Sequence, residues 1–439
     1  MSPPPPLLLL LLCLASTAAS GSGKYGELET LHEWARLDFD WPSAEARETA
    51  IETGRYVPDY CALFDVKAVD GEVFVTAPRL RHGVPASVNR VLARGNNTVF
   101  SPYPSWEVNT PGGDCKGIQN ALAIEIDPLR RMWIVDSGSR DTFSRPINEC
   151  PAKILVWDMV GGREVRRFEF SEDLVPYRMG AMLRGLVLDT AADDAEDWFA
   201  YVAHTTGEQL LVYSWRENAA WNVTHATMKY DVSSIAVEVG SEMASFPTAI
   251  DSLAMTPRAA AEQRLFFAAV SSFRFYSIAT EFLQNRSRVA LASPTELDEQ
   301  VKLVGTRSSQ SEGMTVSDAG VMFYSVLNNN AIDQWNTSVP FSAKDQVYRD
   351  DTRLQWTDSF GWDAGYLYVS SNRWHKAGML LFDSSDEIMF RLLRARVDMN
   401  GYMGPYRKGQ RVGAAGAAPP RATLAATALL CAALAAVAV

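Results

Sequence analysis

The stretch ALAIEIDPLRRMWIV, residues 121–135, contains the unit from which most of this chain is built. Apolar residues alternate over Ala121–Ile126, Asp127-Pro128 interrupts them, and apolar residues resume over Arg131–Val135. This pattern is typical of two antiparallel strands joined by a turn. Ile154–Trp157 then predicts a further strand of the same sheet.

The apolar centre of this unit recurs along the whole middle of the chain. The six segments are Val73-Phe74-Val75, Met132-Trp133-Ile134, Phe199-Ala200-Tyr201, Leu265-Phe266-Phe267, Met322-Phe323-Tyr324 and Leu367-Tyr368-Val369. They are separated by roughly 45 to 67 residues, the range expected when each unit is a four-stranded propeller blade with loop insertions. A sheet that is apolar on both faces needs neighbours on both sides, and a closed ring of blades provides them.

We therefore predict an all-β fold, a six-bladed β-propeller with a central tunnel, over residues 24–408. An open β-sandwich would have the same strand content, but the repeat count favours the propeller. The length between the two terminal segments described next also fits one closed ring.

The N-terminal segment has the pattern of a signal peptide. Leu7–Leu14 is an apolar run that is too short to span a bilayer, and the small residues of Ala15–Ser20 follow it. We predict that residues 1–20 are removed and that the protein is exported.

The C-terminal segment, Leu424–Val439, is uncharged and apolar, with no basic residue after it. A membrane-spanning helix normally needs about 20 apolar residues and basic residues on its cytoplasmic side. Residues 409–423 form a spacer of small and polar residues. This layout favours a signal for a glycosylphosphatidylinositol anchor over a weak transmembrane helix or a secreted form, and it predicts membrane contact only through that anchor.

Four N-glycosylation sequons agree with export, since N-x-Ser/Thr acceptors are used in secreted proteins. Their acceptor residues are Asn96, Asn222, Asn285 and Asn336. We expect an extracellular glycoprotein, either secreted or tethered to the outer cell surface.

Cysteine usage indicates one disulfide. Cys13 and Cys431 lie in the segments expected to be removed, which leaves Cys61, Cys115 and Cys150. An odd number in an oxidising compartment implies one bridge and one remaining thiol. Because Cys115 and Cys150 flank one blade, we predict that they pair and that Cys61 is a buried thiol.

Charge and motifs exclude several functions. The net charge of −11 argues against nucleic acid, whose phosphates require clustered Lys and Arg. There is no C-x-x-C with a nearby His to suggest a metal site, and neither a G-x-S-x-G elbow nor an H-E-x-x-H motif to suggest a hydrolase. We predict neither a metal nor another cofactor.

Short motifs spread over nearly the whole predicted ectodomain resemble, in order, those of the insect yellow and major royal jelly protein family. They are Trp34, Asp38-Phe39, Pro42-Ser43, Glu45-Ala46-Arg47, Ala50 to Gly54, Thr76–Arg79, Gly83–Ala86, Met132–Gly138, Cys150–Lys153, Asn330-Ala331-Ile332, Trp335 and Ser371-Asn372-Arg373. The resemblance implies a secreted six-bladed propeller.

The chain also departs from that family. Relatives often carry a second disulfide, but Leu129 and Ala195 occupy the two positions here. Both cysteines are absent together, as expected if the bridge was lost as a unit. The C-terminal lipid signal is also outside the usual family pattern.

The resemblance implies three classes of function. Some relatives act in melanin formation as dopachrome converters, others bind small amines in the central tunnel, and others are eggshell, cuticle or nutritive proteins. Family membership alone does not choose between these classes.

The amine-binding class implies a set of site residues in the last blade. Trp356, Asp358, Asn372 and Trp374 occupy the places of the family's aromatic, hydroxyl, Asn and aromatic residues, so Asp358 replaces a hydroxyl. Aromatic faces and a carboxylate suit an ammonium group, and Glu312 is a second candidate carboxylate. The alternative is that both Trp residues pack the blade and Asp358 accepts a turn hydrogen bond.

Dopachrome conversion requires a general base that removes and returns a proton on an activated quinone. His375, beside Trp374, is the candidate catalytic residue, although a lone His is more often a surface or packed residue. A surface or matrix role would need no such site. We favour binding of a small amine or catechol-derived ligand in pigment- or cuticle-related processes, with dopachrome conversion (an isomerase-type reaction) and a structural role as alternatives.

Overall fold

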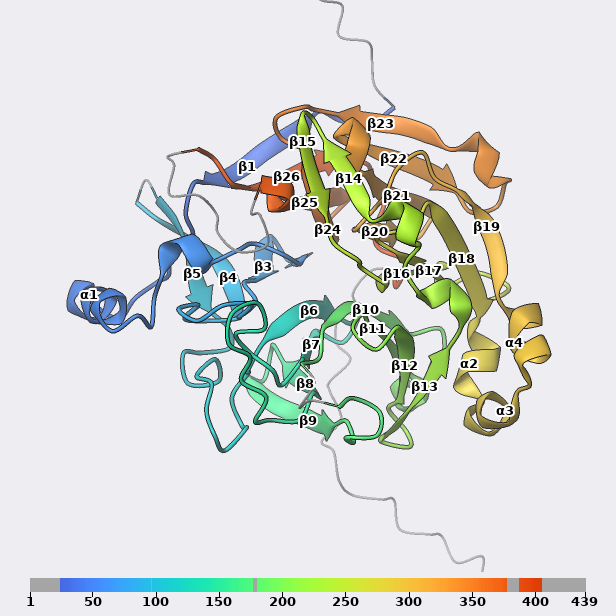
Figure 1. The fold of residues 1–439 in the computed structure, drawn as a ribbon, viewed down its shortest axis with the longest axis horizontal. Coiled ribbons are helices and arrows are strands. Elements are labelled where there is room, and N and C mark those ends of the chain that lie inside the picture. Colours follow the sequence, from blue (N-terminus) through green and yellow to red (C-terminus); the bar gives the residue numbers. More distant parts are fainter. Residues whose placement is uncertain (1–23, 96, 177–179, 377–386, 405–439) are drawn as a thin grey trace, which may run out of the picture.

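The strands form six four-stranded antiparallel sheets arranged around one axis (Figure 1). The computed structural model describes residues 24–95, 97–176, 180–376 and 387–404. From the axis outward, blade one consists of β2 (Val66–Val69), β3 (Glu72–Thr76), β4 (Val88–Arg94) and β5 (Asn97–Pro102), and blade two of β6 (Ala121–Ile126), β7 (Arg131–Asp136), β8 (Lys153–Asp158) and β9 (Arg163–Glu169). In the same order, blade three consists of β10 (Leu183–Asp189), β11 (Phe199–His204), β12 (Gln209–Ser214) and β13 (Ala219–Thr224). Blades four and five are β16 (Ile250–Met255), β17 (Arg264–Ala269), β18 (Arg274–Ala279) and β19 (Lys302–Thr306); and β20 (Met314–Val316), β21 (Val321–Val326), β22 (Ala331–Asn336) and β23 (Asp345–Arg349).

The sixth blade closes the ring with both ends of the described chain. It consists of β24 (Trp356–Asp363), β25 (Tyr366–Asn372), β26 (Phe390–Arg396) and, outermost, β1 (Leu28–Trp34). β1 pairs antiparallel with β26, from Leu28 opposite Ala395 to Trp34 opposite Phe390. Each inner strand also lies beside the next, including β24 beside β2. The six-bladed propeller is therefore confirmed, and the open sandwich is not the fold.

The six apolar segments predicted from the sequence are confirmed as strands, and each is the second strand of its blade. They carry several of the largest buried side chains, among them Trp133, Tyr201, Phe267 and Tyr324. An aromatic residue at this position packs against the neighbouring blade and removes a large apolar area from water. The repeat is thus visible in the sequence because each blade needs the same bulky contact.

The turn between β6 and β7 shows how polar residues define a blade. The Asp127 carboxylate accepts hydrogen bonds from the backbone N–H groups of Leu129 at 2.9 Å and Arg131 at 3.0 Å. This Asx-type turn ends one strand and begins the next. The Arg131 guanidinium lies 4.5 Å from the ring centroid of Trp215 in the third blade, so the same turn also packs blade two against blade three.

Inserted helices lie at the rim of the propeller, and an inserted hairpin lies at one end of its axis. Helix α1 (Ala44–Glu52) lies at the rim beside the first blade, and α2 (Thr280–Gln284), α3 (Arg286–Leu291) and α4 (Pro294–Gln300) lie at the rim beside blade four (Figure 1). The hairpin of β14 (Ala236–Val239) and β15 (Glu242–Ser245) lies across one end of the axis, in contact with the short helices η6 (Leu327–Asn329) and η8 (Trp374–Lys376).

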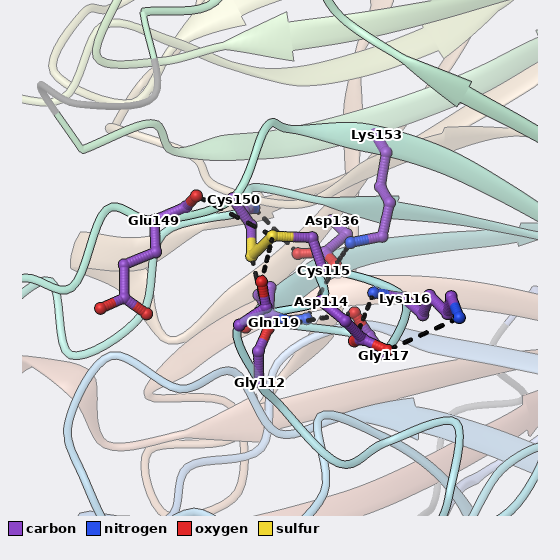
Figure 2. The surroundings of a disulfide bond; sticks show 12 residues. Gly112, Asp114, Cys115, Lys116, Gly117, Gln119, Asp136, Glu149, Cys150 and Lys153 are labelled. Atoms are coloured by element: carbon purple, nitrogen blue, oxygen red, sulfur yellow. Dashed lines mark hydrogen bonds and ion pairs between the residues drawn. A yellow bond between two sulfur atoms is a disulfide. The ribbon is translucent and has the colours of Figure 1, made fainter.

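Cys115 and Cys150 form the predicted disulfide, which joins the loops before β6 and β8 (Figure 2). Next to it, Gly138 has a φ of +70°, and a Cβ there would lie 2.3 Å from the carbonyl oxygen of Cys150, so only glycine fits. Cys61 is buried and unbridged, as expected. Burial raises the pKa of its thiol well above the usual range, which disfavours the reactive thiolate.

A buried ion pair lies beside the disulfide. Lys153 Nζ is 2.7 Å from Asp136 Oδ2, and neither side chain is exposed (Figure 2). Burial would raise the pKa of Asp136, but Lys153 and the N–H groups of Gln119 and Gly138 lower it below its usual range. This carboxylate therefore stays ionised and ties the loops of blade two to its strands.

Several predictions concern segments outside the described residues. These are the signal peptide over 1–20, the spacer over 409–423, the tail over 424–439 and the acceptor Asn96. Within the described ranges, no helix has the length and apolar character needed to cross a membrane.

Candidate functional site

The inner strands enclose a cavity of about 900 Å³ on the axis. All six of these strands contribute to its wall, together with residues 400–404. Arg184, Asp251 and Asp358 stand near the starts of their strands and meet at one end of the cavity. Tyr402 lies toward the other end, where its backbone N–H donates to Val316 and its hydroxyl accepts from the Leu188 N–H.

The cavity wall is strongly acidic. Among the described residues that line it, the carboxyl groups are those of Asp65, Asp70, Glu125, Asp158, Asp251, Glu312, Asp358 and Asp363. The basic groups there are those of Lys67, Arg130 and Arg184. Eight acidic side chains against three basic ones leave the wall with an excess of carboxyl groups, and those that are ionised favour a cationic occupant.

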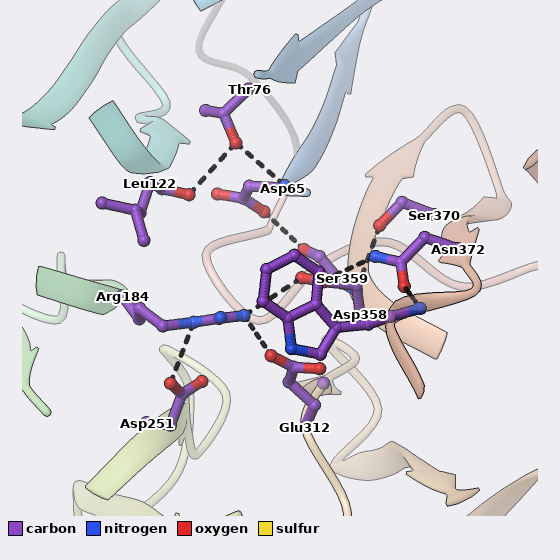
Figure 3. A network of polar contacts seen from close by, with 12 residues as sticks. Asp65, Thr76, Leu122, Arg184, Asp251, Glu312, Asp358, Ser359, Ser370 and Asn372 are labelled. Carbon is purple, nitrogen blue, oxygen red and sulfur yellow. Dashed lines mark hydrogen bonds and ion pairs between the residues drawn. The ribbon is translucent and has the colours of Figure 1, made fainter. Parts of the chain in front are cut away.

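At one end of the cavity, Arg184 pairs with carboxyl groups from three other blades (Figure 3). Its Nε is 2.9 Å from Asp251 Oδ2, and its Nη2 is 3.5 Å from Asp358 Oδ1 and also pairs with Glu312. The guanidinium lies over the Phe64 ring, 4.8 Å from the centroid. All four charged side chains are less than one-tenth exposed.

Gly185 positions Arg184, because it allows strand β10 to approach strand β16 closely. A Cβ at Gly185 would lie 2.2 Å from the carbonyl oxygen of Asp251. Because only glycine allows this contact, it lets β10 come close to β16 and brings the Arg184 side chain to the Asp251 carboxylate.

One guanidinium does not offset the burial of three carboxyl groups, whose pKa values are all raised. Burial raises the pKa of Glu312 well above its usual range; Arg184 opposes the shift, and Asp358 and Asp251 add to it. Burial likewise raises the pKa of Asp358 to about 7, with Arg184 again opposing. The pKa of Asp251 is also raised, mainly by burial. These carboxyl groups either hold protons near neutral pH or accept further positive charge.

The structure brings together the four residues implied by the family resemblance. Asn372 Nδ2 donates to Asp358 Oδ2 at 3.0 Å and to the Leu63 carbonyl at 3.1 Å, while its Oδ1 accepts from the Trp374 N–H at 2.9 Å. The fully buried Trp356 indole donates to Glu312 and packs against Phe246 of the segment that follows β15. Trp374 packs edge-on against Phe64.

Only part of this predicted set faces the cavity. Asp358 and Glu312 line it, whereas Trp356, Asn372 and Trp374 do not. Trp356 instead belongs to a small apolar cluster with Val237 and Val239 of the β14–β15 hairpin. The sequence therefore identified true neighbours but did not show which of them border empty space.

His375 lies at the same crowded end. Its side chain is 6% exposed and stacks on Trp356, with ring centroids 6.2 Å apart. Burial lowers its pKa to about 4, and Lys376 and Arg373 lower it further. His375 does not line the cavity. Its proposed catalytic role stays a prediction, and a base acting inside the cavity would have to be a different residue.

Glu125 and Lys67 are cavity residues that the sequence analysis missed. Lys67 Nζ donates to Asp65 Oδ1 at 2.7 Å and to two backbone carbonyls. Glu125, in the inner strand β6, is 9% exposed and lines the cavity. The signal was present in the sequence, because a Glu within an otherwise apolar strand that is buried on both faces needs a functional or structural reason.

Three glycosylation acceptors fall within the described chain. Asn285 and Asn336 are exposed, whereas Asn222 is half-buried and donates to Gln209 Oε1 at 2.6 Å. Their glycosylation stays a prediction.

A propeller whose axis holds an acidic, partly aromatic cavity is the class of protein that the fold and site define. Residues 119–403 match the family model described as major royal jelly protein. This match covers more than half of the sequence, so the chain belongs to the major royal jelly protein family, which confirms the resemblance of its motifs.

Curated relatives include Protein yellow of Drosophila subobscura, 29% identical over 358 residues, with 78% of this chain and 60% of that protein covered. Protein yellow of Drosophila melanogaster is 26% identical over 344 residues, covering 75% of this chain and 61% of the relative. The chain thus spans about 60% of the length of these relatives. Among solved structures, a luciferin-regenerating enzyme aligns with a TM-score of 0.45 and 12% identity, covering 86% of this chain and 97% of that one.

Proposed function

We propose that this protein is an extracellular member of the family that binds a small amine or catechol-derived ligand in its central cavity and acts in pigment- or cuticle-related processes. The observation that carries the proposal is the excess of carboxyl groups, eight against three basic groups, around an enclosed space of about 900 Å³. This volume lies within the range of known small-molecule sites.

The apolar part of the wall supports a ligand with an aromatic ring. Phe360, Trp362 and Tyr402 all line the cavity. The Trp362 indole is held in place by donating to Thr315 Oγ1 at 2.8 Å. Aromatic rings offer stacking surfaces for a catechol or indole and favourable contacts for a cation.

Matched ligands that differ only in charge test this proposal. We expect dopamine to bind the purified protein in isothermal titration calorimetry, and 3,4-dihydroxyphenylacetic acid, which carries a carboxylate in place of the ammonium, to bind at least tenfold more weakly. Affinity for dopamine should fall as salt concentration rises, because exposed parts of the field are screened. Equal binding of the two compounds would refute charge selection by the cavity.

Dopachrome conversion is a second candidate, favoured by Asp358. This carboxyl faces the cavity, and its pKa of about 7 leaves it able both to accept and to return a proton at neutral pH. The reaction moves a proton on an already oxidised ring and needs no further oxidant. The test is whether purified protein accelerates the loss of dopachrome absorbance, and whether Asp358→Asn abolishes that acceleration.

Export is part of the proposal. The Cys115–Cys150 disulfide supports it, because such bonds persist in oxidising compartments. We infer that the protein is displayed on the outer cell surface through a lipid anchor. Release of the intact protein from cells by a phosphatidylinositol-specific phospholipase would support the anchor, and retention after treatment would contradict it.

A further inference from the structure

Glu125 has fewer hydrogen-bond donors than the half-buried Asp363, and among the described residues no basic side chain pairs with it. Its Oε1 accepts one hydrogen bond, from the backbone N–H of the adjacent Ile126 at 2.9 Å. Its Oε2 accepts none within the described chain, and no Lys, Arg or His of that part of the molecule lies within ion-pair distance. A carboxyl group that is nine-tenths buried and this poorly satisfied is unfavourable unless something else pairs with it.

The other carboxyl groups already have partners. Arg184 pairs with Asp251, Glu312 and Asp358. Lys67 pairs with Asp65, Arg130 pairs with Asp70, and Arg163 lies 4.0 Å from Asp158. Asp363 makes no ion pair within the described residues, but it accepts two backbone N–H groups, at 2.7 and 3.2 Å, and is only half-buried. Glu125 is therefore the least satisfied anion in the wall.

Lys67 is the basic group that faces Glu125, yet it has no donor to spare. An ammonium has three N–H donors, and those of Lys67 are directed to Asp65 Oδ1 at 2.7 Å, the Val66 carbonyl at 3.2 Å and the Phe360 carbonyl at 3.2 Å. Lys67 therefore lowers the pKa of Glu125 only through its positive charge and not through a hydrogen bond.

The charges around Glu125 leave it protonated in part at neutral pH. Burial raises the pKa of Glu125 to about 7; Lys67 and the Ile126 N–H oppose the shift, and Asp65 and Asp127 add to it. From the C-terminal segment, the Tyr402 hydroxyl is close enough for Glu125 to contribute to the raised pKa of that tyrosine. A cation placed beside Glu125 would remove the burial penalty and favour the ionised carboxylate.

We propose that Glu125 is the residue that pairs with the ligand's ammonium group and that it releases its proton when the ligand binds. This inference rests on the proposed function. Since a carboxylate recognises an ammonium through charge-assisted N–H donors, the ligand class is a primary amine rather than a quaternary one.

Coupling between proton release and binding provides the test. With a free pKa of about 7, the affinity of the wild-type protein for dopamine should rise about tenfold between pH 6 and pH 8, with close to one proton released per ligand at pH 6. Calorimetry in two buffers with different ionisation enthalpies measures this proton directly. Trimethylated dopamine should bind more weakly than dopamine.

Glu125→Gln keeps the shape of the side chain and removes its charge. We expect this variant to bind dopamine at least tenfold more weakly and to lose both the pH dependence and the proton release. Glu164→Gln, on the exposed strand β9 of the same blade, is the matched control and should behave like the wild type. Circular dichroism and thermal melting check that both variants fold.

The outcomes separate this inference from the proposed function. Wild-type binding with no proton release, or with a pH dependence that persists in Glu125→Gln, overturns the role of Glu125 but leaves amine binding standing. The wild-type measurement needs no variant, so the inference stays testable if Glu125→Gln does not fold. If the wild-type protein binds no amine at all, both proposals fail.

Discussion

Two buried polar residues of the propeller axis, Asn372 and Glu125, differ in how completely the protein satisfies their hydrogen bonds. At the end covered by the β14–β15 hairpin, Asn372 directs both its amide groups to protein partners and Trp356 is fully buried. In the cavity, Glu125 is buried as well, but it borders space and lacks a basic partner within the described residues. The protein itself satisfies the Asn372 amide, whereas it leaves the Glu125 carboxyl group incompletely satisfied beside a cavity that can hold a ligand.

The comparison also separates two kinds of evidence about function. The motif match in the last blade found residues that contact one another, yet most of their polar groups already form hydrogen bonds within the protein. Charge that the fold leaves uncompensated points to the place where another molecule can lower the free energy. The second kind of evidence requires the positions of all six inner strands.

The largest effect on stability is expected at Arg184, which forms the buried ion pairs on the axis. Arg184→Met leaves the carboxyl groups of Asp251, Glu312 and Asp358 buried without their cation, which should lower the free energy of unfolding by about 3–5 kcal/mol at neutral pH. Because these groups can be neutralised by protonation, the loss should shrink at pH 5. Urea unfolding at the two pH values measures it.

Arg216→Met is the matched control for that measurement. Arg216 is about half exposed and pairs with Asp194 and Asp197 on the surface, so its removal should change stability by less than about 1 kcal/mol. If the two variants lost equal stability, the buried ion pairs of Arg184 would contribute no more to stability than the surface ion pairs of Arg216.

Glu125 should give the next largest effect, with a defined pH dependence. Its folded pKa of about 7 lies above the ordinary value of 4.5, so any stability linked to its proton is complete below pH 4.5 and lost as the pH rises through 7. Glu125→Gln avoids that loss and should be more stable than the wild type at pH 8 by about 3 kcal/mol. The gain should be absent at pH 4.

The fold was largely predictable from the sequence because each blade repeats the same bulky second strand. Phe74, Trp133 and Tyr201 stand at equivalent positions, and this local pattern needs no knowledge of distant contacts. The closure of blade six by β1 was not predicted, since the pairing of Leu28 with Ala395 joins the two ends of the chain. The β14–β15 hairpin was not predicted, because it is an insertion between blades three and four that lies outside the blade repeat.

The site was predictable only where a local motif carried it. The family resemblance predicted Trp356, Asp358 and Asn372 as a set; they are neighbours in two adjacent strands of one blade, but only Asp358 lines the cavity. Arg184 and its carboxylate partners come from four blades, and no spacing in the sequence reveals that they converge. Glu125 could have been found as a charged residue in an apolar strand, but its lack of a partner depends on Lys67 being fully engaged elsewhere.

His375 should show the smallest effect and the opposite pH dependence from Glu125. Its folded pKa of about 4 lies below the ordinary value of 6.5, so the stability linked to its neutral ring is complete above pH 6.5 and lost as the pH falls through 4. His375→Phe keeps the stacking on Trp356 and removes the titrating group. At pH 4.5 it should exceed the wild type by about 2 kcal/mol in free energy of unfolding, with the difference reduced at pH 8. His82→Phe, at an exposed site, is the control and should follow the wild-type curve. If His375→Phe instead gained stability relative to the wild type as the pH rose, the pKa of His375 would be raised, as that of Glu125 is. The two residues would then not differ in their pH dependence.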